Sequence, residues 1–203
     1  YWDKRQLVKK INLNSLYGAI LNPGCRFFDI RIGQSVTLSG RCITKHMACK
    51  VNEIVAGKYD HKGESIVYGD TDSVYFTAHK TLKKEIQEGT IPWTKDSVVA
   101  LYDKISDEVN TSFKAFMTRA FHTPSTRGEV IAAGRELVAS KGLFITKKRY
   151  AVLYYDKEGE RTDTEGKEGK MKAMGLDLKR SDTPVFVQDF LSEILYMVLQ
   201  GKD

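Results

Sequence analysis

The sequence is poor in cysteine and histidine, and neither residue type follows a metal-binding pattern. Cys25, Cys42 and Cys49 are odd in number and lack CxxC spacing, which excludes a disulfide framework. We therefore expect a reduced, intracellular setting, with Cys42 and Cys49 as packing thiols buried in a helix. The four histidines also lack the paired spacing of metal ligands.

Signal-like segments and long apolar runs are missing as well. The chain opens without a charged-then-apolar segment, and it has no uncharged apolar stretch of membrane-spanning length, so we expect no membrane partner. The Gly-rich, charged stretch at residues 163–170 lacks the GxxxxGK[ST] order of a phosphate-binding loop. We interpret this stretch as a solvated loop.

Apolar residues and positive charge are what the sequence does contain. Of the 203 residues, 41% are apolar, which is enough to bury a sizeable core in one large or two small domains. The formal net charge is +6. Clustered Lys and Arg neutralise phosphates and release counterions, so this charge favours a polyanionic partner, although basicity alone is weak evidence for nucleic acid.

Hydrophobic spacing predicts four helices. The first is expected to be amphipathic and to end at the turn of residues 22–24, and Gly57 is expected to end the second. Pro124 breaks the third, and Pro184 opens the last. The helical stretches cover residues 7–20, 32–56, 98–121 and 184–198.

Two kinds of β-rich segment complete an α+β fold. Residues 66–68 and 74–76 are β-rich runs on either side of Gly69-Asp70-Thr71-Asp72-Ser73, which predicts a hairpin with carboxylates at its tip. Residues 130–155 contain short β-rich runs, followed by a turn at residues 157–160. These runs predict a small mixed sheet.

The carboxylate pair is the sharpest chemical feature. Asp70 and Asp72 are close enough to repel each other, and a divalent cation would remove this cost. Hard oxygen ligands suit Mg²⁺, which takes one or two protein carboxylates together with substrate phosphates. The alternative is an exposed Asx-type turn, which a bare DxD sequence would favour. The flanking aromatic residues and strands favour the metal hypothesis.

The segment YGDTDS at residues 68–73 resembles motif C of the family B (alpha-like) DNA-directed DNA polymerases, and three more segments agree with this resemblance in chain order. The resemblance covers almost the whole chain, and the residues of these segments are most similar to those of the replicative polymerases of tailed bacteriophages. The three segments are residues 9–18 (KKINLNSLYG), similar to the motif B helix, residues 147–150 (KKRY), similar to the KxY motif, and residues 174–184, similar to the segment that leads into the thumb.

The resemblance implies a partial polymerase palm that takes part in DNA replication. The end of the fingers is expected over residues 1–25, the palm over residues 26–180 and the start of the thumb over residues 181–203. The implied reaction is template-directed nucleotidyl transfer from a dNTP to a primer 3′-hydroxyl with two Mg²⁺ ions. Asp72 would bind both ions, while Asp70 would shape the hairpin and bind more weakly.

The resemblance also implies contacts with the nucleotide on the first helix. Lys10 would meet the triphosphate of the incoming nucleotide. Asn14 and Tyr17 lie four and seven residues further along, so they share its helix face and would lie toward the nucleotide and the nascent base pair. Alternatively, the three residues are only the polar edge of an amphipathic helix.

Contacts with the primer are expected in the KKRY segment. Lys148 and Tyr150 lie two apart on a predicted strand, so they project from one face and suit a primer strand, with Lys147 beside them. Alternatively, the segment is a solvated basic strand end. Tyr68 either touches the primer end or packs as a hairpin aromatic.

Several parts of the family pattern are missing from this sequence. The second metal-binding aspartate, in motif A, would share a metal ion with Asp72, and the proofreading exonuclease, most of the fingers and a complete thumb are also missing. We therefore expect the isolated chain to be inactive. It is interpreted as a fragment of a longer polymerase, or as a split subunit whose partner chain supplies motif A, or as a non-catalytic DNA-binding remnant.

The implied partners follow from this interpretation. They are primer–template DNA, a dNTP, the remainder of the polymerase in the same or a partner chain, and a sliding clamp. If the protein is viral, the expected location is the host cytoplasm.

Overall fold

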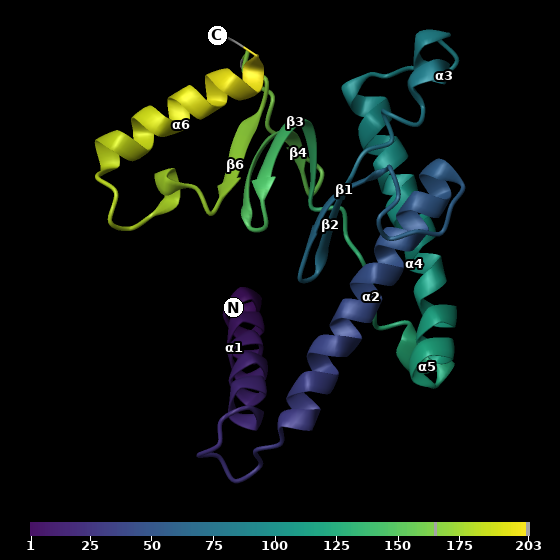
Figure 1. Ribbon diagram of the computed structural model, residues 1–203, viewed down its shortest axis with the longest axis vertical. Helices are drawn as coiled ribbons and strands as arrows, with labels where there is room; N and C mark the ends of the chain where they lie inside the picture. The colour runs from purple at the N-terminus through teal and green to yellow at the C-terminus, as the bar shows by residue number, and fades with distance from the viewer. Residues whose placement is uncertain (165, 202–203) are drawn as a thin grey trace.

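The computed structural model describes residues 1–164 and 166–201 and confirms the α+β class. All four predicted helices are present. In chain order (Figure 1), the elements are α1 Trp2–Ile20, α2 Ile30–Ala56, β1 Ile66–Asp70, β2 Ser73–Phe76, α3 Lys83–Gln87, α4 Lys95–Phe121, α5 Ser125–Gly128, β3 Leu137–Thr146, β4 Arg149–Lys157, β5 Glu160–Arg161, β6 Lys170–Met174, the 3₁₀ turn η1 Asp177–Lys179 and α6 Val185–Gln200.

Local capping signals set the ends of the long helices. The Asp29 carboxylate accepts a hydrogen bond from the Arg31 backbone N–H at 2.9 Å and caps the start of α2. Gly57 ends this helix in the left-handed conformation, with φ of 70°. Thr94 and Ser97 form a reciprocal capping box at the start of α4. Short-range chemistry therefore sets these boundaries, and of the three the end at Gly57 was predicted.

The strands form two antiparallel sheets. β1 pairs with β2, and β4 pairs with β3 on one side and with β5 and β6 on the other. The predicted mixed sheet is therefore wrong in its strand directions. Turns too short for a crossover join β3 to β4 and β4 to β5, and such turns allow only antiparallel pairing. Strand β6, rich in Lys and Met, was not predicted, and its first residue, Lys170, ends the stretch interpreted as a solvated loop.

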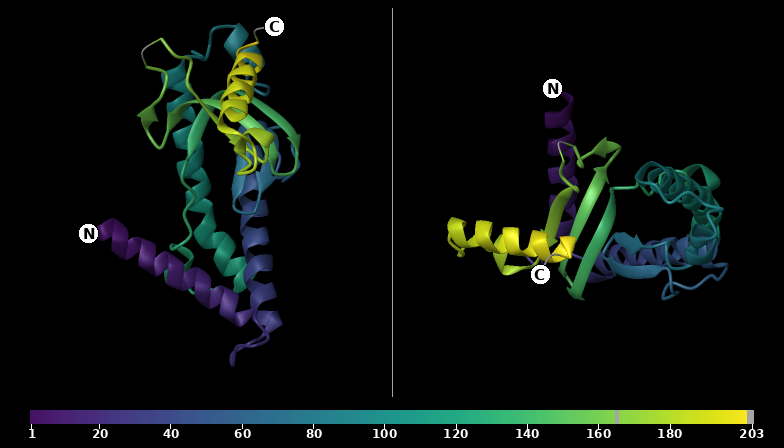
Figure 2. Two further views of the ribbon diagram at one scale, coloured as in Figure 1. Left: turned by 90° about the vertical axis from the view of Figure 1, so that its left-hand side faces the viewer. Right: turned by 90° about the horizontal axis from the view of Figure 1, so that it is seen from above.

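The core joins the helices to both sheets. Figures 1 and 2 show the larger sheet between α6 and the β1–β2 hairpin, with α2 and α4 beyond the hairpin. Val51 of α2 packs with Ile105, Val109 and Phe113 of α4, and partly buried side chains of the hairpin cover this cluster. Smaller clusters join α4 to β3 and β4, and β4 to α6. The hairpin is therefore seated on the α2–α4 pair.

Helix α1 forms where it was predicted, but it is not amphipathic. At 3.6 residues per turn, Leu13 and Leu16 point away from Leu7 and Ile11, and all four side chains are more than half exposed. Figure 2 shows α1 diverging from α2 toward the N-terminus. The apolar side chains of α1 therefore surround the helix instead of forming one buried stripe.

The cysteine prediction is half confirmed. Cys49 is buried in α2, whereas Cys42, two turns earlier on the same helix, is exposed. The packing of α2 against the α4 cluster begins only at Ile43, so the first half of α2 has no core to bury a thiol. Two cysteines on the same face of a helix are therefore not equally buried.

A buried histidine links α2 to α4. His46 Nδ1 lies 2.8 Å from the Tyr59 hydroxyl and Nε2 lies 2.9 Å from Ser112 Oγ, while the ring stacks on Phe116. Ser112 donates its own proton to the Val109 carbonyl oxygen, so it accepts from His46 Nε2–H. Burial lowers the pKa of His46, because the imidazolium form would lose its hydration.

This histidine is expected to make the fold less stable in acid. Below its usual pKa of about 6.5, His46 in the unfolded chain takes up a proton before the folded form does. The free energy of unfolding should therefore fall as the pH drops from about 7.5 to about 5.5. His46→Gln keeps a hydrogen-bond donor and acceptor but does not titrate, so the thermal unfolding of a protein with this substitution should depend less on pH. An equal loss of stability in both proteins would contradict this expectation.

Candidate active site

The two aspartates occupy the tip of the β1–β2 hairpin. Asp70 is the last residue of β1 and pairs with Ser73, the first residue of β2, so Thr71 and Asp72 form the turn. Asp72 is exposed and Asp70 is half-buried. Thr71 has a φ of 47°, an uncommon conformation for a β-branched residue that costs about 1–3 kcal/mol. The predicted carboxylate hairpin is therefore confirmed, and its turn is strained.

Hydrogen bonds hold this strained tip against α2. Thr44 Oγ1 donates to the Thr71 carbonyl oxygen at 2.9 Å, across 27 residues of sequence. Ser73 Oγ donates to the Asp70 carbonyl oxygen at 3.1 Å, and Thr71 Oγ1 donates to the Asp70 carboxylate at 3.2 Å. These bonds use the backbone and one Asp70 oxygen, and they fix the turn that presents the two carboxylates.

A cavity of about 840 Å³ lies beside the tip, between α2, the hairpin and the turn that joins β3 to β4. The charged side chains that line this cavity are mainly basic, and the two aspartates of the hairpin tip line it as well. Phosphate groups suit such a rim, and a divalent cation suits the carboxylates. The charged side chains in the lining are Arg41, Lys45, Asp70, Asp72, Lys147 and Lys148.

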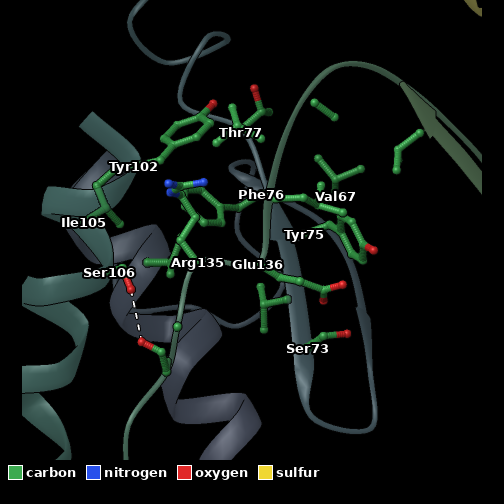
Figure 3. A pocket seen from close by; sticks show the side chains of 18 of the residues that line it. Val67, Ser73, Tyr75, Phe76, Thr77, Tyr102, Ile105, Ser106, Arg135 and Glu136 are labelled. Atoms are coloured by element: carbon green, nitrogen blue, oxygen red, sulfur yellow. Dashed lines mark hydrogen bonds between the residues drawn. The ribbon is translucent and has the colours of Figure 1, made fainter. Parts of the chain in front are cut away.

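A second cavity, of about 520 Å³, adjoins the hairpin between β2, α4 and the segment that leads into β3 (Figure 3). Tyr75 and Phe76 line it from β2, and Arg135 and Glu136 line it from the segment before β3. Asp72 borders both cavities. The exposed Asp72 carboxylate therefore lies where the two cavities meet.

The donor set fits a metal ion that is completed by other ligands. Within the described residues, no three His, Cys, Asp or Glu side chains come together as a metal-binding cluster. Asp70 and Asp72 are two hard oxygen donors, which matches Mg²⁺ bound by one or two protein carboxylates and substrate phosphates. The two carboxylates are therefore compatible with part of a site for a divalent cation.

The basic KKRY segment is arranged differently from the prediction. Strand β3 ends at Thr146 and β4 begins at Arg149, so Lys147 and Lys148 form the hairpin turn. The prediction that Lys148 and Tyr150 share one strand face is wrong, because Lys148 lies in the turn with a φ of 61°. Both lysines are exposed and border the larger cavity.

Tyr150 lies under this turn in a cluster of four aromatic rings, the aromatic cluster, formed with Tyr68, Tyr75 and Phe144. Tyr150 is only 6% exposed. Tyr75 donates its hydroxyl proton to the Tyr150 hydroxyl at 3.2 Å, and burial raises the pKa of Tyr75. The Tyr68 hydroxyl accepts a hydrogen bond from the Lys148 backbone N–H at 2.7 Å. The aromatic cluster therefore joins the carboxylate hairpin to the basic turn.

The residues predicted on the first helix lie apart from this site. Lys10 and Asn14 are exposed on α1 and Tyr17 is half-buried, and their spacing puts all three on one helix face. The lining of the larger cavity comes from elements after α1. The structure therefore brings together the predicted aspartates and lysines, but it does not add the three α1 residues to them.

Sequence reasoning missed Thr44, Arg41 and Lys45. Arg41 and Lys45 are four residues apart on α2, and Thr44 lies between them on the side that meets the hairpin. Their helical spacing was visible in the sequence. Their relation to the carboxylates depends on how the hairpin packs, and no local signal carried that information.

A carboxylate hairpin that faces a basic turn across an open cavity has the composition of a site for metal-bound phosphates. The sequence profile of DNA polymerase family B matches residues 1–203. The chain belongs to this family, which confirms the resemblance drawn from the motifs. Among the described helices, none combines the length and the apolar character needed to span a membrane.

Phage polymerases are among its curated relatives. The chain is 32% identical to the DNA-directed DNA polymerase of Escherichia phage RB69 over 205 residues, covering 96% of this chain and 22% of that protein. It is 31% identical to the corresponding protein of Enterobacteria phage T4, with 98% and 22% covered. It is 29% identical to a DNA polymerase delta catalytic subunit of Oryza sativa subsp. japonica, with 99% and 15% covered. The chain thus spans about a fifth of the length of the phage relatives.

Proposed function

We propose that this chain supplies the carboxylate hairpin and the primer-binding turn of a family B DNA polymerase. The reaction is template-directed transfer of a nucleotidyl group from a dNTP to a primer 3′-hydroxyl. The observation that carries the proposal is the position of Asp72, which is exposed at the hairpin tip and borders the same cavity as Lys147 and Lys148. Membership of the polymerase family gives this geometry its functional context.

Asp72 is proposed as the main metal ligand, with Asp70 as a weaker one. When bound, two Mg²⁺ ions would stabilise the attacking 3′-hydroxyl and the leaving pyrophosphate. Asp72 is exposed at the turn, whereas one oxygen of the half-buried Asp70 carboxylate already accepts a hydrogen bond from Thr71. This difference supports the unequal roles of the two aspartates.

Contacts with DNA are proposed for the basic turn. Lys147 and Lys148 are exposed and have side chains long enough to reach primer phosphates or the minor groove. The Tyr68 hydroxyl accepts a hydrogen bond from the Lys148 backbone N–H, so of the two predicted roles of Tyr68 we propose packing in the hairpin, with an effect on DNA binding through the position of Lys148. Contact of Tyr150 with DNA would require its ring to leave the aromatic cluster, so we propose that Tyr150 supports the turn through packing.

The nucleotide contacts and the domain division also belong to the proposal. Lys10, Asn14 and Tyr17 would bind the incoming dNTP when α1 faces the hairpin in the assembled enzyme. Residues 1–25 would then be the end of the fingers, residues 26–180 the palm and residues 181–203 the start of the thumb. The divergence of α1 from the rest of the chain supports the first boundary. A sliding clamp as partner and the host cytoplasm as location remain predictions.

The remainder of the polymerase is the partner that this proposal requires, because the second metal-binding carboxylate is expected in motif A. The test is Mg²⁺-dependent primer extension by this chain alone and mixed with a polypeptide that carries the motif A region. Extension by the mixture only would support the proposal. Salt-dependent DNA binding without extension by the mixture would favour a non-catalytic binding remnant. Extension by the chain alone would refute the need for a second carboxylate.

Thr44 offers a test of how the hairpin is aligned. Thr44→Val preserves the shape of the side chain but removes the hydrogen bond to the Thr71 carbonyl oxygen. The loss of one such bond is worth about 1 kcal/mol, so the rate of nucleotide addition should fall about 5-fold. The measurement is single-turnover extension by the polymerase that contains this chain.

Thr118→Val is the matched control for this substitution. The Thr118 hydroxyl donates to the Lys114 carbonyl oxygen, within its own helix and away from both cavities. Its removal should leave the extension rate unchanged. Equal rates for wild type and Thr44→Val would show that the hairpin tip keeps its alignment without the bond from α2.

A further inference from the structure

We propose that Gly175 is a positioning residue for Lys148, because the Lys148 carbonyl group leaves no space for a side chain at position 175. The inference rests on the proposed contact between Lys148 and DNA. It extends that proposal to a residue outside the linings of both cavities.

Gly175 meets the turn because of the register of the larger sheet. Strand β6 ends at Met174, which pairs with Tyr150 of β4, and Gly175 follows directly beside the start of β4. A Cβ atom at position 175 would lie 2.0 Å from the Lys148 carbonyl oxygen and 3.1 Å from its carbonyl carbon. The nearest obstacle is therefore backbone, which does not rotate aside as a side chain does. Gly175 also has a φ of 64°, which glycine adopts without strain.

The turn is held from its other side by the carboxylate hairpin. Lys148 has a φ of 61°, and its backbone N–H donates to the Tyr68 hydroxyl at 2.7 Å. Tyr68 belongs to β1, the strand that ends at Asp70. The Lys148 backbone is therefore held between Gly175 at its carbonyl group and Tyr68 at its N–H group. These two contacts fix the turn relative to the carboxylates with which it shares a cavity.

A methyl group at position 175 would have to displace the Lys148 carbonyl group. Movement of this group rotates the peptide plane that follows Lys148 and reorients the Lys148 side chain. The exposed Lys148 would then reach DNA phosphates less well, while the metal ligands on the hairpin stay in place. We therefore expect Gly175→Ala to weaken DNA binding through Lys148 and to leave nucleotide binding unaffected.

The experiment uses the full polymerase that contains this chain, with Gly175→Ala, Lys148→Ala and the double variant. The dissociation constant for primer–template DNA is measured at several salt concentrations, together with the KM for the dNTP. Tyr68→Phe removes the second contact without adding an atom, and it serves if the alanine variant does not fold. Like Gly175→Ala, it is combined with Lys148→Ala.

Two other glycines provide matched controls. Gly89 has a φ of 74° and open space where a Cβ atom would lie, so Gly89→Ala introduces backbone strain alone. Gly169 has a φ of 146°, and its Cβ would lie 2.2 Å from the Tyr154 carbonyl oxygen, further along β4. Gly169→Ala therefore disturbs the same sheet away from the basic turn. Thermal unfolding of each variant separates loss of stability from loss of binding.

The expected result is a dissociation constant raised about 5- to 10-fold by Gly175→Ala, with the magnitude of the salt slope reduced by about one. Gly175→Ala and Tyr68→Phe should each add little to Lys148→Ala, because they act through the same side chain. The KM for the dNTP should not change. Gly89→Ala and Gly169→Ala should keep the wild-type salt slope, even where they lower thermal stability.

Additive losses in the double variants would overturn the inference, and so would an unchanged salt slope for Gly175→Ala. If Lys148→Ala itself binds DNA as tightly as wild type, the proposed DNA contact of Lys148 fails, and the role of Gly175 fails with it. These outcomes distinguish an error in the positioning role from an error in the proposed function.

Discussion

Asp72→Asn is expected to lower the rate of nucleotide addition at least about 10³-fold in the polymerase that we propose to contain this chain, a loss of about 4 kcal/mol of transition-state stabilisation. The side chain keeps its size, but a neutral amide is a poorer ligand for Mg²⁺ than a carboxylate is. Asp72 is exposed at a turn, so the fold should not depend on its charge. The measurement is single-turnover primer extension at saturating dNTP and primer–template DNA.

Two further aspartates calibrate this result. Asp70→Asn should reduce the rate less than Asp72→Asn, because one Asp70 oxygen is already hydrogen-bonded within the turn. Asp107 is exposed on α4, outside both cavities, and Asp107→Asn should leave the rate unchanged. An Asp72→Asn enzyme that works within about 10-fold of the wild-type rate would rule out Asp72 as the principal metal ligand.

Arg135→Met is expected to destabilise the fold by about 3–5 kcal/mol, because it leaves a buried carboxylate without its cation. Arg135 pairs with Asp156, which is only 2% exposed, and with Asp103 of α4. Burial opposes the charge of Arg135, but the hydrogen bonds to Asp103 and Asp156 outweigh it and raise its pKa. The network therefore ties α4 to β4 beside the second cavity. Hydrogen exchange of the β4 amides in the polymerase would measure the loss.

Arg180→Met is the control for the Arg135 prediction. Arg180 pairs with Asp182 at the surface, where both side chains are more than half exposed, and such pairs contribute about 0–1 kcal/mol. Combining Arg135→Met with Asp156→Leu should restore part of the lost stability, because no buried charge is then left unpaired. If Arg135→Met were no more harmful than Arg180→Met, the pair with Asp156 would have little energetic importance.

The parts of the fold that were predictable are those with local causes. The end of α2 at Gly57 and the start of α6 after Pro184 follow from the conformational limits of glycine and proline. The pairing of β6 with β4, the exposure of Cys42 and the lack of a buried stripe on α1 depend on contacts between distant segments. Hydrophobic periodicity predicted which helices form, but not which of their side chains are buried against another element.

The candidate site divides in the same way. Asp70 and Asp72 were identified from a six-residue motif, and the hairpin that carries them forms as predicted. Lys148 was predicted on a strand but lies in the turn. The last residue of this turn and the first residue of the strand are one position apart, and the sequence pattern did not distinguish them. Thr44 and Gly175 act across 27 residues of sequence, in each case on a backbone carbonyl group. No local sequence pattern predicts such contacts.

The aromatic cluster sets the distance between the carboxylates of the smaller sheet and the lysines at the turn of the larger sheet. Tyr68 and Tyr75 extend from the hairpin, Phe144 and Tyr150 extend from β3 and β4, and neighbouring ring centres lie 5.3–6.1 Å apart. The rings therefore act as a spacer whose thickness is side-chain volume. A smaller residue at Phe144 would let the carboxylates and the lysines approach each other, so the width of the site depends on a residue that carries no charge itself.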